Sequence, residues 1–303
     1  MQSQHGVANS TSLVRVIIMI QTNTHPIPQL SFILQQCEED MLFRLQHNQP
    51  SLFHLNSGGN RSRAKLCIEA GIALQLPSKA IIALACTIEL LHNASLVHDD
   101  LQDSETTRRG RQSVWKKYGK SHAICAGDIM ISAAYGALAD IGTHSSLASL
   151  LIHTTEAVSV TIQGQSRDID AKSDISEQQY EDIAAMKSGP LIQLTLGLPL
   201  LMSGHGQHVK IANQALHKFA IAYQIVDDLN DWQQDLQHNQ LNLINLLAKK
   251  CSIKEAIYFA RNRAQYLLMQ CEKELKVLPS NCATSVINAS RKLLANANEG
   301  IYD

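Results

Sequence analysis

Two short acidic segments carry the residues of this 303-residue chain whose types and spacing could do chemistry. The first contains Asp99 and Asp103, and the second contains Asp227 and Asp231. Residues four positions apart share one face of an α-helix, so each pair presents two carboxylates side by side. One such pair alone could be a solvated helix end. Two pairs, each behind an apolar stretch, indicate carboxylates that face one another across an interior space.

Facing carboxylates repel one another in a medium of low dielectric constant, so they need cations to lie close together. Hard oxygen donors without His or Cys favour Mg²⁺, which usually keeps further coordination positions for phosphate oxygens. The acidic segments therefore predict Mg²⁺ between two helices, together with an anionic ligand such as a diphosphate.

Cationic and polar side chains near the acidic segments could hold this anion. Guanidinium groups match the geometry of phosphate oxygens, and glycines let a backbone approach closely. Two arginines follow the first acidic pair, another follows a Gly-Gly loop, and a Lys-Ser pair interrupts an apolar stretch. These candidate residues are Arg63, Arg108, Arg109, Lys187 and Ser188.

Two further residues lie on the acidic stripes. His92 precedes Asp99 by seven positions, and Gln224 precedes Asp227 by three. On a helix, each would share a face with the acid that follows it. Both are therefore candidates for contact with the anion, although a lone histidine is more often a core residue.

Helical periodicity dominates the chain. Apolar residues recur at spacings of three and four, Gly (15) and Pro (7) are scarce, and no alternating strand pattern stands out. Ser78 and Ser176 stand where helix N-caps are expected. The pattern predicts an all-α, single-domain helical bundle around a central cavity, spanning 26–303, with 1–25 as a loosely ordered leader. The expected helices span residues 28–48, 62–76, 78–104, 121–141, 146–171, 176–203, 208–236, 240–249, 253–275 and 281–296.

Composition excludes several other classes of protein. The net charge of -1 and pI of about 6.9 lack the basic surplus of nucleic-acid-binding proteins, so we expect no nucleic-acid partner. Seven scattered cysteines without a CxxC pair are typical of free thiols in a reducing cytoplasm. No apolar run reaches the ~18 residues of a membrane span, so no span is expected.

Two segments resemble the aspartate-rich motifs of the trans-isoprenyl diphosphate synthases, the polyprenyl synthetase family. They are ELLHNASLVHDDLQDSETTRRGR (Glu89–Arg111) and YQIVDDLND (Tyr223–Asp231). The similarity runs roughly from 58 to 235, with supporting pieces at 126–128, 163–168 and 187–188. It implies the isoprenoid synthase type I fold, a homodimer, and a protein similar to geranylgeranyl diphosphate synthases.

The resemblance also implies a reaction. Isopentenyl diphosphate would be condensed with an allylic diphosphate (dimethylallyl, geranyl or farnesyl) through ionisation assisted by Mg²⁺. The expected catalytic residues are Asp99, Asp103, Asp227 and Lys187. By the family pattern, the metal residues are Asp99, Asp103, Asp227 and Asp231; the allylic diphosphate residues are Arg108, Lys187, Ser188 and Gln224; and the isopentenyl diphosphate residues are Arg63, His92 and Arg109.

The chain departs from the family pattern at two places. The substrate-binding loop, usually GGKRxRP, has Asn60 in place of the lysine and Ala64 in place of the proline. Losing an ammonium group from an anion site costs on the order of 1.5–3 kcal/mol, unless Lys65 or another base substitutes. After Asp231 the usual lysine-bearing segment is shorter and has no lysine until Lys249.

Small residues precede the first acidic pair. In this family the product tunnel runs beside this helix, and the residues one turn before the first aspartate form its wall or floor. Ala94 and Ser95 stand five and four positions before Asp99. A bulky aromatic residue there would stop growth at C15, so we expect a product of C20 or somewhat longer.

Three alternatives stand beside the elongating synthase. A class I terpene cyclase shares the fold and the ionisation, but its second metal motif has the form NDxxSxxxE, where this chain has a second DDxxD. A prenyltransferase with another acceptor is compatible with Asn60 and with the altered segment after Asp231. A non-catalytic partner subunit of a synthase would not need the intact acidic residues.

Overall fold

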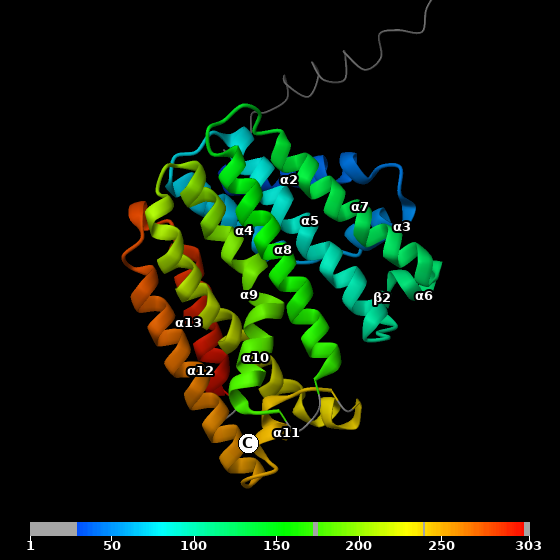
Figure 1. Cartoon of the computed structure of the whole chain (residues 1–303), viewed down its shortest axis with the longest axis vertical. Helices are drawn as coiled ribbons and strands as arrows, with labels where there is room; N and C mark the ends of the chain where they lie inside the picture. Colours follow the sequence, from blue (N-terminus) through cyan, green and yellow to red (C-terminus); the bar gives the residue numbers. More distant parts are fainter. Residues whose placement is uncertain (1–28, 172–174, 239, 300–303) are drawn as a thin grey trace, which may run out of the picture.

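The computed structural model describes residues 29–171, 175–238 and 240–299, and these form an all-α bundle, as predicted (Figure 1). The leader predicted for 1–25 lies outside the described residues. The helices are α2 (Gln29–Leu45), α3 (Gln49–Leu55), α4 (Ser62–Ala73), α5 (Ser78–Gln102), α6 (Val114–Tyr118), α7 (Lys120–Ala139), α8 (Leu147–Asp170), α9 (Glu177–Met202), α10 (Val209–His238), α11 (Leu243–Leu247), α12 (Ile253–Leu275) and α13 (Thr284–Glu299), with 3₁₀ turns at Gly206–His208 and Pro279–Asn281.

Two short helices and one two-stranded hairpin were not predicted. Helices α3 and α6 have 7 and 5 residues, too few to show a helical repeat in the sequence. The expectation of no strand was wrong at one hairpin, where β1 (Thr107–Arg108) pairs antiparallel with β2 (Arg111–Gln112). Two-residue strands carry no alternation, so the sequence could not reveal them.

The two predicted N-caps had different outcomes. Ser176 caps α9, because its hydroxyl oxygen accepts a hydrogen bond from the backbone N–H of Gln179. The side-chain oxygen of Gln179 accepts in turn from the backbone N–H of Ser176, which completes a capping box. The prediction for Ser78 was wrong, because Pro77 holds the cap position and Ser78 is the first residue of α5. Pro77 has φ -59° and ψ 139°, so its backbone is not helical and the helix begins at the next residue.

Helix α5 is the central helix of one half of the core. It buries side chains on nearly all sides, against α2, α4, α7 and α9, while a second apolar cluster joins α9, α10, α12 and α13. Helix α9 contributes to both clusters and thus connects the two halves. This packing fixes the C-terminal ends of α5 and α10, which carry the acidic segments.

Among the described residues, α5 and α7 are long and apolar enough, by length and composition, to cross a membrane. In α5, 78% of the most apolar stretch is buried inside the protein, as in the core helix of a bundle. In α7 the corresponding share is 39%, so this helix presents an apolar face to its surroundings.

Helices α8 and α9 approach closely at a glycine. A Cβ atom added at Gly164 would lie 2.5 Å from the backbone nitrogen of Lys187 and 2.5 Å from the carbonyl carbon of Met186. Backbone atoms cannot move aside as the end of a flexible side chain can. Gly164 therefore sets the distance between α8 and the segment of α9 that carries Lys187.

We expect Gly164→Ala to lower the free energy of unfolding by about 1–3 kcal/mol, because overpacking forces the two backbones apart. Urea unfolding followed by circular dichroism would measure this change. Gly136→Ala on the exposed side of α7 is the control, since its Cβ would meet only the Arg44 guanidinium at 3.4 Å. The control should gain up to about 1 kcal/mol from helix propensity. Equal behaviour of the two variants would contradict the close approach.

Candidate active site

A cavity of about 520 Å³ lies where the ends of α5, α8 and α10 meet the start of α9. Both predicted acidic segments reach it, Asp103 from α5 and Asp227 and Asp231 from α10. Helical spacing explains this arrangement in α10, since Asp227 and Asp231 are four residues apart and share one face of the helix. The structure thus brings together residues that lie more than 120 positions apart in the sequence.

Negative charge dominates the lining of this cavity. Among the described residues of the lining, seven carboxylates face two cationic side chains, Arg108 and Lys187. The donors are oxygens, which suits Mg²⁺. Within the described parts of the chain, no group of three His, Cys, Asp or Glu side chains is close enough to hold a metal unaided. The donor set therefore fits divalent cations that take further oxygen ligands from a phosphate group or water. The carboxylates are Asp103, Glu105, Asp168, Asp227, Asp228, Asp231 and Asp235.

Burial and neighbouring acids disfavour the ionised form of the carboxylates in this region. Burial, as the largest cause, and the neighbouring Asp103 raise the pKa of Asp99 to about 6, although Lys187 opposes them. Burial also raises the pKa of Asp103 and of Asp227, with further contributions from nearby acids. A bound cation would remove this penalty, which is the expected electrostatic property of a metal site. Asp99 lies on the stripe of Asp103 but outside the cavity lining.

Lys187 lies at the centre of this acidic field. Its Nζ donates a hydrogen bond of 2.6 Å to Asp168 of α8. Burial would lower the pKa of Lys187, but Asp168, Asp99 and Asp103 outweigh it and raise the pKa above its usual value. The side chain is therefore a fixed positive charge in the cavity wall. Ser188 follows it on α9 and is half-buried.

The second aspartate of the α10 motif has a structural function. Asp228 is 2% exposed and accepts hydrogen bonds from Tyr180 Oη (2.7 Å), Gln224 Nε2 (3.0 Å) and the Leu243 backbone N–H (2.6 Å). These bonds connect α9, α10 and the start of α11. Burial raises the pKa of Asp228 to about 7, against the effect of its three donors. Gln224, a predicted ligand, lines the cavity and is oriented by this carboxylate.

The segment after Asp231 closes the cavity without a lysine. Gln234, Asp235 and Gln240 line it here, so the cation that the family pattern places in this segment is absent from the lining. Asn242 Nδ2 donates to the Asp228 carbonyl (3.0 Å) and to Asp235 Oδ2 (2.8 Å), which ties the turn to α10. Sequence reasoning did not select Asp235, although its spacing of four from Asp231 continues the stripe.

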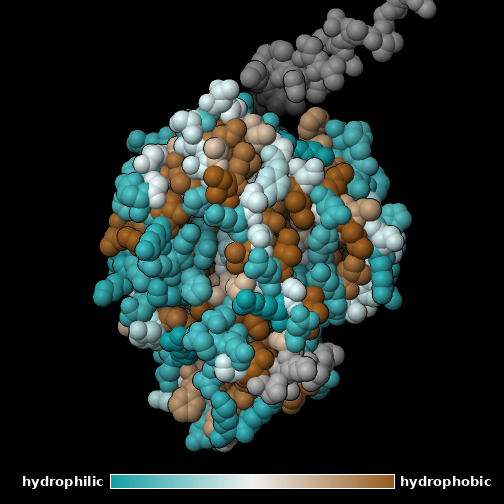
Figure 2. Space-filling view, in the orientation of Figure 1, coloured by the Kyte–Doolittle hydropathy of each residue, from teal (hydrophilic) through white to brown (hydrophobic). Residues whose placement is uncertain are grey.

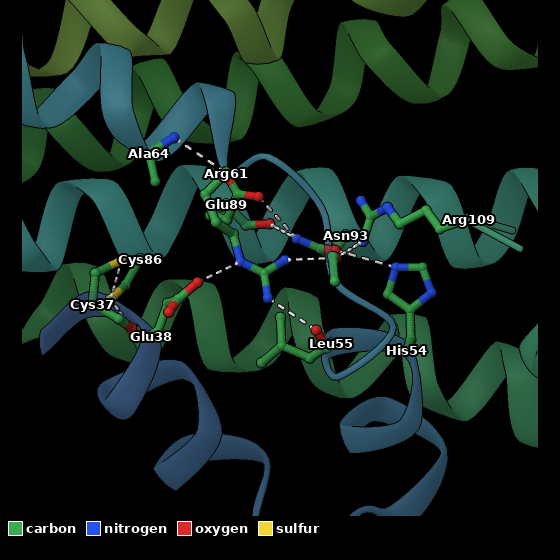
Figure 3. Close-up of polar contacts among 11 residues, drawn as sticks. Cys37, Glu38, His54, Leu55, Arg61, Ala64, Cys86, Glu89, Asn93 and Arg109 are labelled. Carbon is green, nitrogen blue, oxygen red and sulfur yellow. Dashed lines mark hydrogen bonds and ion pairs between the residues drawn. The ribbon is translucent and has the colours of Figure 1, made fainter. Parts of the chain in front are cut away.

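A basic cluster surrounds His92, which lies seven residues before Asp99 in α5. Arg63 Nη1 is 2.9 Å from His92 Nε2, so these two predicted residues meet. Burial, followed by the Arg63 charge, lowers the pKa of His92 well below its usual value, so the ring is neutral. Glu89 accepts from the Ala64 N–H (3.1 Å) and from Asn93 (3.3 Å), in a buried network that also reaches His54 (Figure 3).

Arg108 and Arg109 of the hairpin point in different directions. Arg108 pairs with the buried carboxylate of Asp100, with Nε 2.8 Å from Oδ1, and also lines the acidic cavity. Arg109 donates to the Gly58 carbonyl and lies over Gly59, where a Cβ atom would be 2.6 Å from its Cζ. Only a glycine at 59 allows this contact. The predicted residue Asn60 is exposed on the same loop.

The chain belongs to the polyprenyl synthetase family, because the model of this family matches residues 46–275. Its solved structural neighbours show the same all-α fold. A geranylgeranyl pyrophosphate synthetase from Geoglobus acetivorans superposes with a TM-score of 0.77 at 23% identity, covering 88% of this chain and 98% of that one. A decaprenyl diphosphate synthase from Rhodobacter capsulatus has a TM-score of 0.76 at 18% identity, covering 95% and 99%.

Relatives by sequence carry related names. A short chain isoprenyl diphosphate synthase of Methanocaldococcus jannaschii is 26% identical over 66% of this chain and 63% of its own length. A (2E,6E)-farnesyl diphosphate synthase of Mycobacterium bovis is 32% identical over 57% of this chain. The chain spans 49% of the length of that enzyme. A geranylgeranyl pyrophosphate synthase of Geoglobus acetivorans is 28% identical over 81% of this chain and 79% of its own.

Asp228 should make stability fall as pH rises. Its pKa is about 7 in the folded protein against an ordinary 3.8, so the folded state binds this proton more tightly. The stability it contributes is complete below about pH 4 and is lost as pH rises through 7. The side chain of Asp228→Asn cannot ionise, so the variant does not lose this stability as pH rises. The free energy of unfolding of the variant minus that of the wild type should therefore increase by about 1 kcal/mol or more from pH 5 to pH 8.

Urea unfolding in EDTA at the two pH values measures this shift. Asp182→Asn, an exposed carboxyl on the same helix as Lys187, is the control and should show no comparable shift. A difference for Asp228→Asn that is the same at pH 5 and pH 8 would show that the carboxyl is ionised at both.

Proposed function

We propose that this protein is a trans-prenyltransferase that condenses isopentenyl diphosphate with an allylic diphosphate. The observation that carries this proposal is the meeting of both acidic stripes and Lys187 around one cavity. The family membership and the names of the relatives support the same reaction. The excess of carboxylates excludes direct binding of a bare diphosphate, so the proposal includes Mg²⁺.

The side chains would divide the binding between two sites. Asp99, Asp103, Asp227 and Asp231 would hold Mg²⁺, which when bound neutralises the carboxylates and stabilises charge on a leaving pyrophosphate. Lys187 would donate to an oxygen of the allylic diphosphate, with Ser188, Gln224 and Arg108 around it. Arg63, His92 and Arg109, in the basic cluster around His92, would hold the diphosphate of isopentenyl diphosphate.

The proposed reaction transfers the allylic group from pyrophosphate to isopentenyl diphosphate. The bond between C1 and oxygen of the allylic diphosphate breaks, and its electron pair leaves with pyrophosphate. The isopentenyl double bond then forms the new carbon–carbon bond, and a proton is lost from the isopentenyl unit. Lys187, held by Asp168, would keep a positive charge beside the leaving group, and Ile183 and Ala184 of α9 would shield the cation from water.

We propose a product of C20 or somewhat longer. Ser95 is one turn before Asp99 on the same helix face, and its hydroxyl donates to the His92 carbonyl at 2.9 Å. Ala94 is 2% exposed within the core around α5. Both side chains are smaller than an aromatic ring, and relatives named for geranylgeranyl and geranylfarnesyl products agree with this length.

We also propose a cytoplasmic homodimer. Helices α7 and α8 expose a row of large aliphatic side chains, and brown patches run along this face in Figure 2. A contiguous apolar surface of this kind marks an interface. Self-association would cover it and would explain the apolar exposed face of α7 without a membrane. The exposed residues are Ile124, Ile129, Leu151, Ile152, Ile162 and Ile169.

Incubation of the purified protein with Mg²⁺, farnesyl diphosphate and labelled isopentenyl diphosphate tests the proposed reaction. A longer prenyl diphosphate is the expected product, and EDTA should abolish it. A hydrocarbon formed without isopentenyl diphosphate would show a cyclase. No turnover would point to another acceptor or to a partner subunit.

Single carboxylate variants test the roles of the two stripes. Asp103→Asn and Asp227→Asn should each lower kcat by about 100-fold or more, with unchanged circular dichroism, because each removes a metal ligand from the transition state. Asp182→Asn is the matched control outside the cavity and should retain activity. Normal rates in either cavity variant would remove that stripe from the mechanism.

The Ser95→Phe variant tests the proposed path of the product. A phenyl ring on the Asp99 face of α5 should stop elongation early, so C15 should replace the longer product in chain-length analysis. Ser95→Ala keeps the space open and should leave the product length unchanged. An unchanged product from Ser95→Phe would place the growing chain elsewhere.

A further inference from the structure

The Gly-Gly loop between α3 and α4 lacks a cation that a diphosphate site would use. Asn60 is exposed there and carries no charge. Yet the surroundings are built for an anion, since Arg63 Nε is buried and has no hydrogen-bond partner. Helix α4 begins beside it without a side-chain cap. A diphosphate at this loop would therefore need a positive charge from another residue.

Arg61, next to Asn60, is committed to holding the loop. Its side chain donates to the Leu55 carbonyl (2.9 Å) and the Gly58 carbonyl (3.3 Å) and pairs with Glu38 (3.2 Å), as Figure 3 shows. The residue is 8% exposed. Its guanidinium therefore points into the protein and not toward a ligand at the loop surface.

Arg111 approaches the same loop from the hairpin. Arg108 and Arg111 are cross-strand partners, and Arg108 is occupied by Asp100. Arg109 and Arg111 instead both reach the loop, where Arg111 Nη1 donates to the Asn56 carbonyl at 3.2 Å. Among the described residues no carboxylate pairs with Arg111, and its side chain is exposed. Its positive charge is thus uncompensated beside the loop.

We infer that Arg111 supplies the cation that Asn60 cannot, and that it binds the diphosphate of isopentenyl diphosphate together with Arg63 and Arg109. This inference rests on the proposed function. A guanidinium can keep its bond to the Asn56 carbonyl and still present other N–H donors to phosphate oxygens. Arg111 thereby becomes a specificity-determining residue for the acceptor substrate.

Calorimetric titration of isopentenyl diphosphate in EDTA tests the inference without turnover and without Mg²⁺. Arg111→Gln should weaken binding about tenfold, as expected for a lost charged hydrogen bond. The double variant Asn60→Lys/Arg111→Gln should return to within about threefold of the wild type, since a lysine at 60 restores the charge. Lys116→Gln on the neighbouring helix α6 removes the same charge from an exposed position and should bind normally.

Steady-state kinetics provide a second readout. Arg111→Gln should raise KM for isopentenyl diphosphate, with little change in kcat or in KM for the allylic substrate. Equal loss for both substrates, or no rescue by Asn60→Lys, would overturn the inference. A defect in Lys65→Gln with normal binding by Arg111→Gln would show that Lys65 is the substitute. If the wild type itself fails to bind isopentenyl diphosphate, the proposed function falls as well.

Discussion

Electrostatic repulsion within one cavity is the constraint on which the rest of this structure depends. Among the described residues, seven carboxylates and two cationic side chains surround about 520 Å³, and burial raises the pKa of Asp103, Asp227 and Asp228. Such a site is unfavourable by itself, and bound cations would relieve the repulsion between its walls. The helix ends must therefore be rigid enough to keep the acids together, which explains the long, deeply packed helices that carry them.

Several contacts provide this rigidity. Gly164 lets α8 and α9 touch backbone to backbone, so that Asp168 can hold Lys187. Asp228 is buried and accepts three hydrogen bonds, one of which orients Gln224 toward the cavity. The acidic motif of α10 thus contains two kinds of aspartate, those that face the cavity and one that fixes the helix to its neighbours.

The basic cluster around His92 differs in charge from the acidic cavity. There, arginines and neutral histidines surround a loop whose backbone carbonyls are already bound, and only Glu89 and Glu38 offset the positive charge within the network of Figure 3. His92 lies seven residues before Asp99 in the same helix, so both share one face of α5. The proposed sites for the two diphosphates are therefore neighbours along one helix, one rich in carboxylates and the other rich in cationic side chains.

Much of this arrangement follows from helical periodicity in the sequence. The long helices were predictable because their apolar repeats extend over many turns, and the two acidic stripes were predictable from their spacing of four. The hairpin at 107–112 was not, since two-residue strands leave no pattern. The structural role of Asp228 could not be predicted from the sequence either, because its hydrogen-bond partners Tyr180 and Leu243 lie far from it along the chain. Similarly, the separate partners of Arg108 and Arg109 depend on a turn geometry that adjacent letters do not reveal.

Calorimetric titration of inorganic pyrophosphate tests the central claim most directly. With Mg²⁺ present, the wild type should bind pyrophosphate in the acidic cavity, and either Asp103→Asn or Asp227→Asn should abolish that metal-dependent binding, because both walls share one ligand. Metal-dependent binding that survives the loss of either wall, or that has the same affinity in EDTA, would contradict the account.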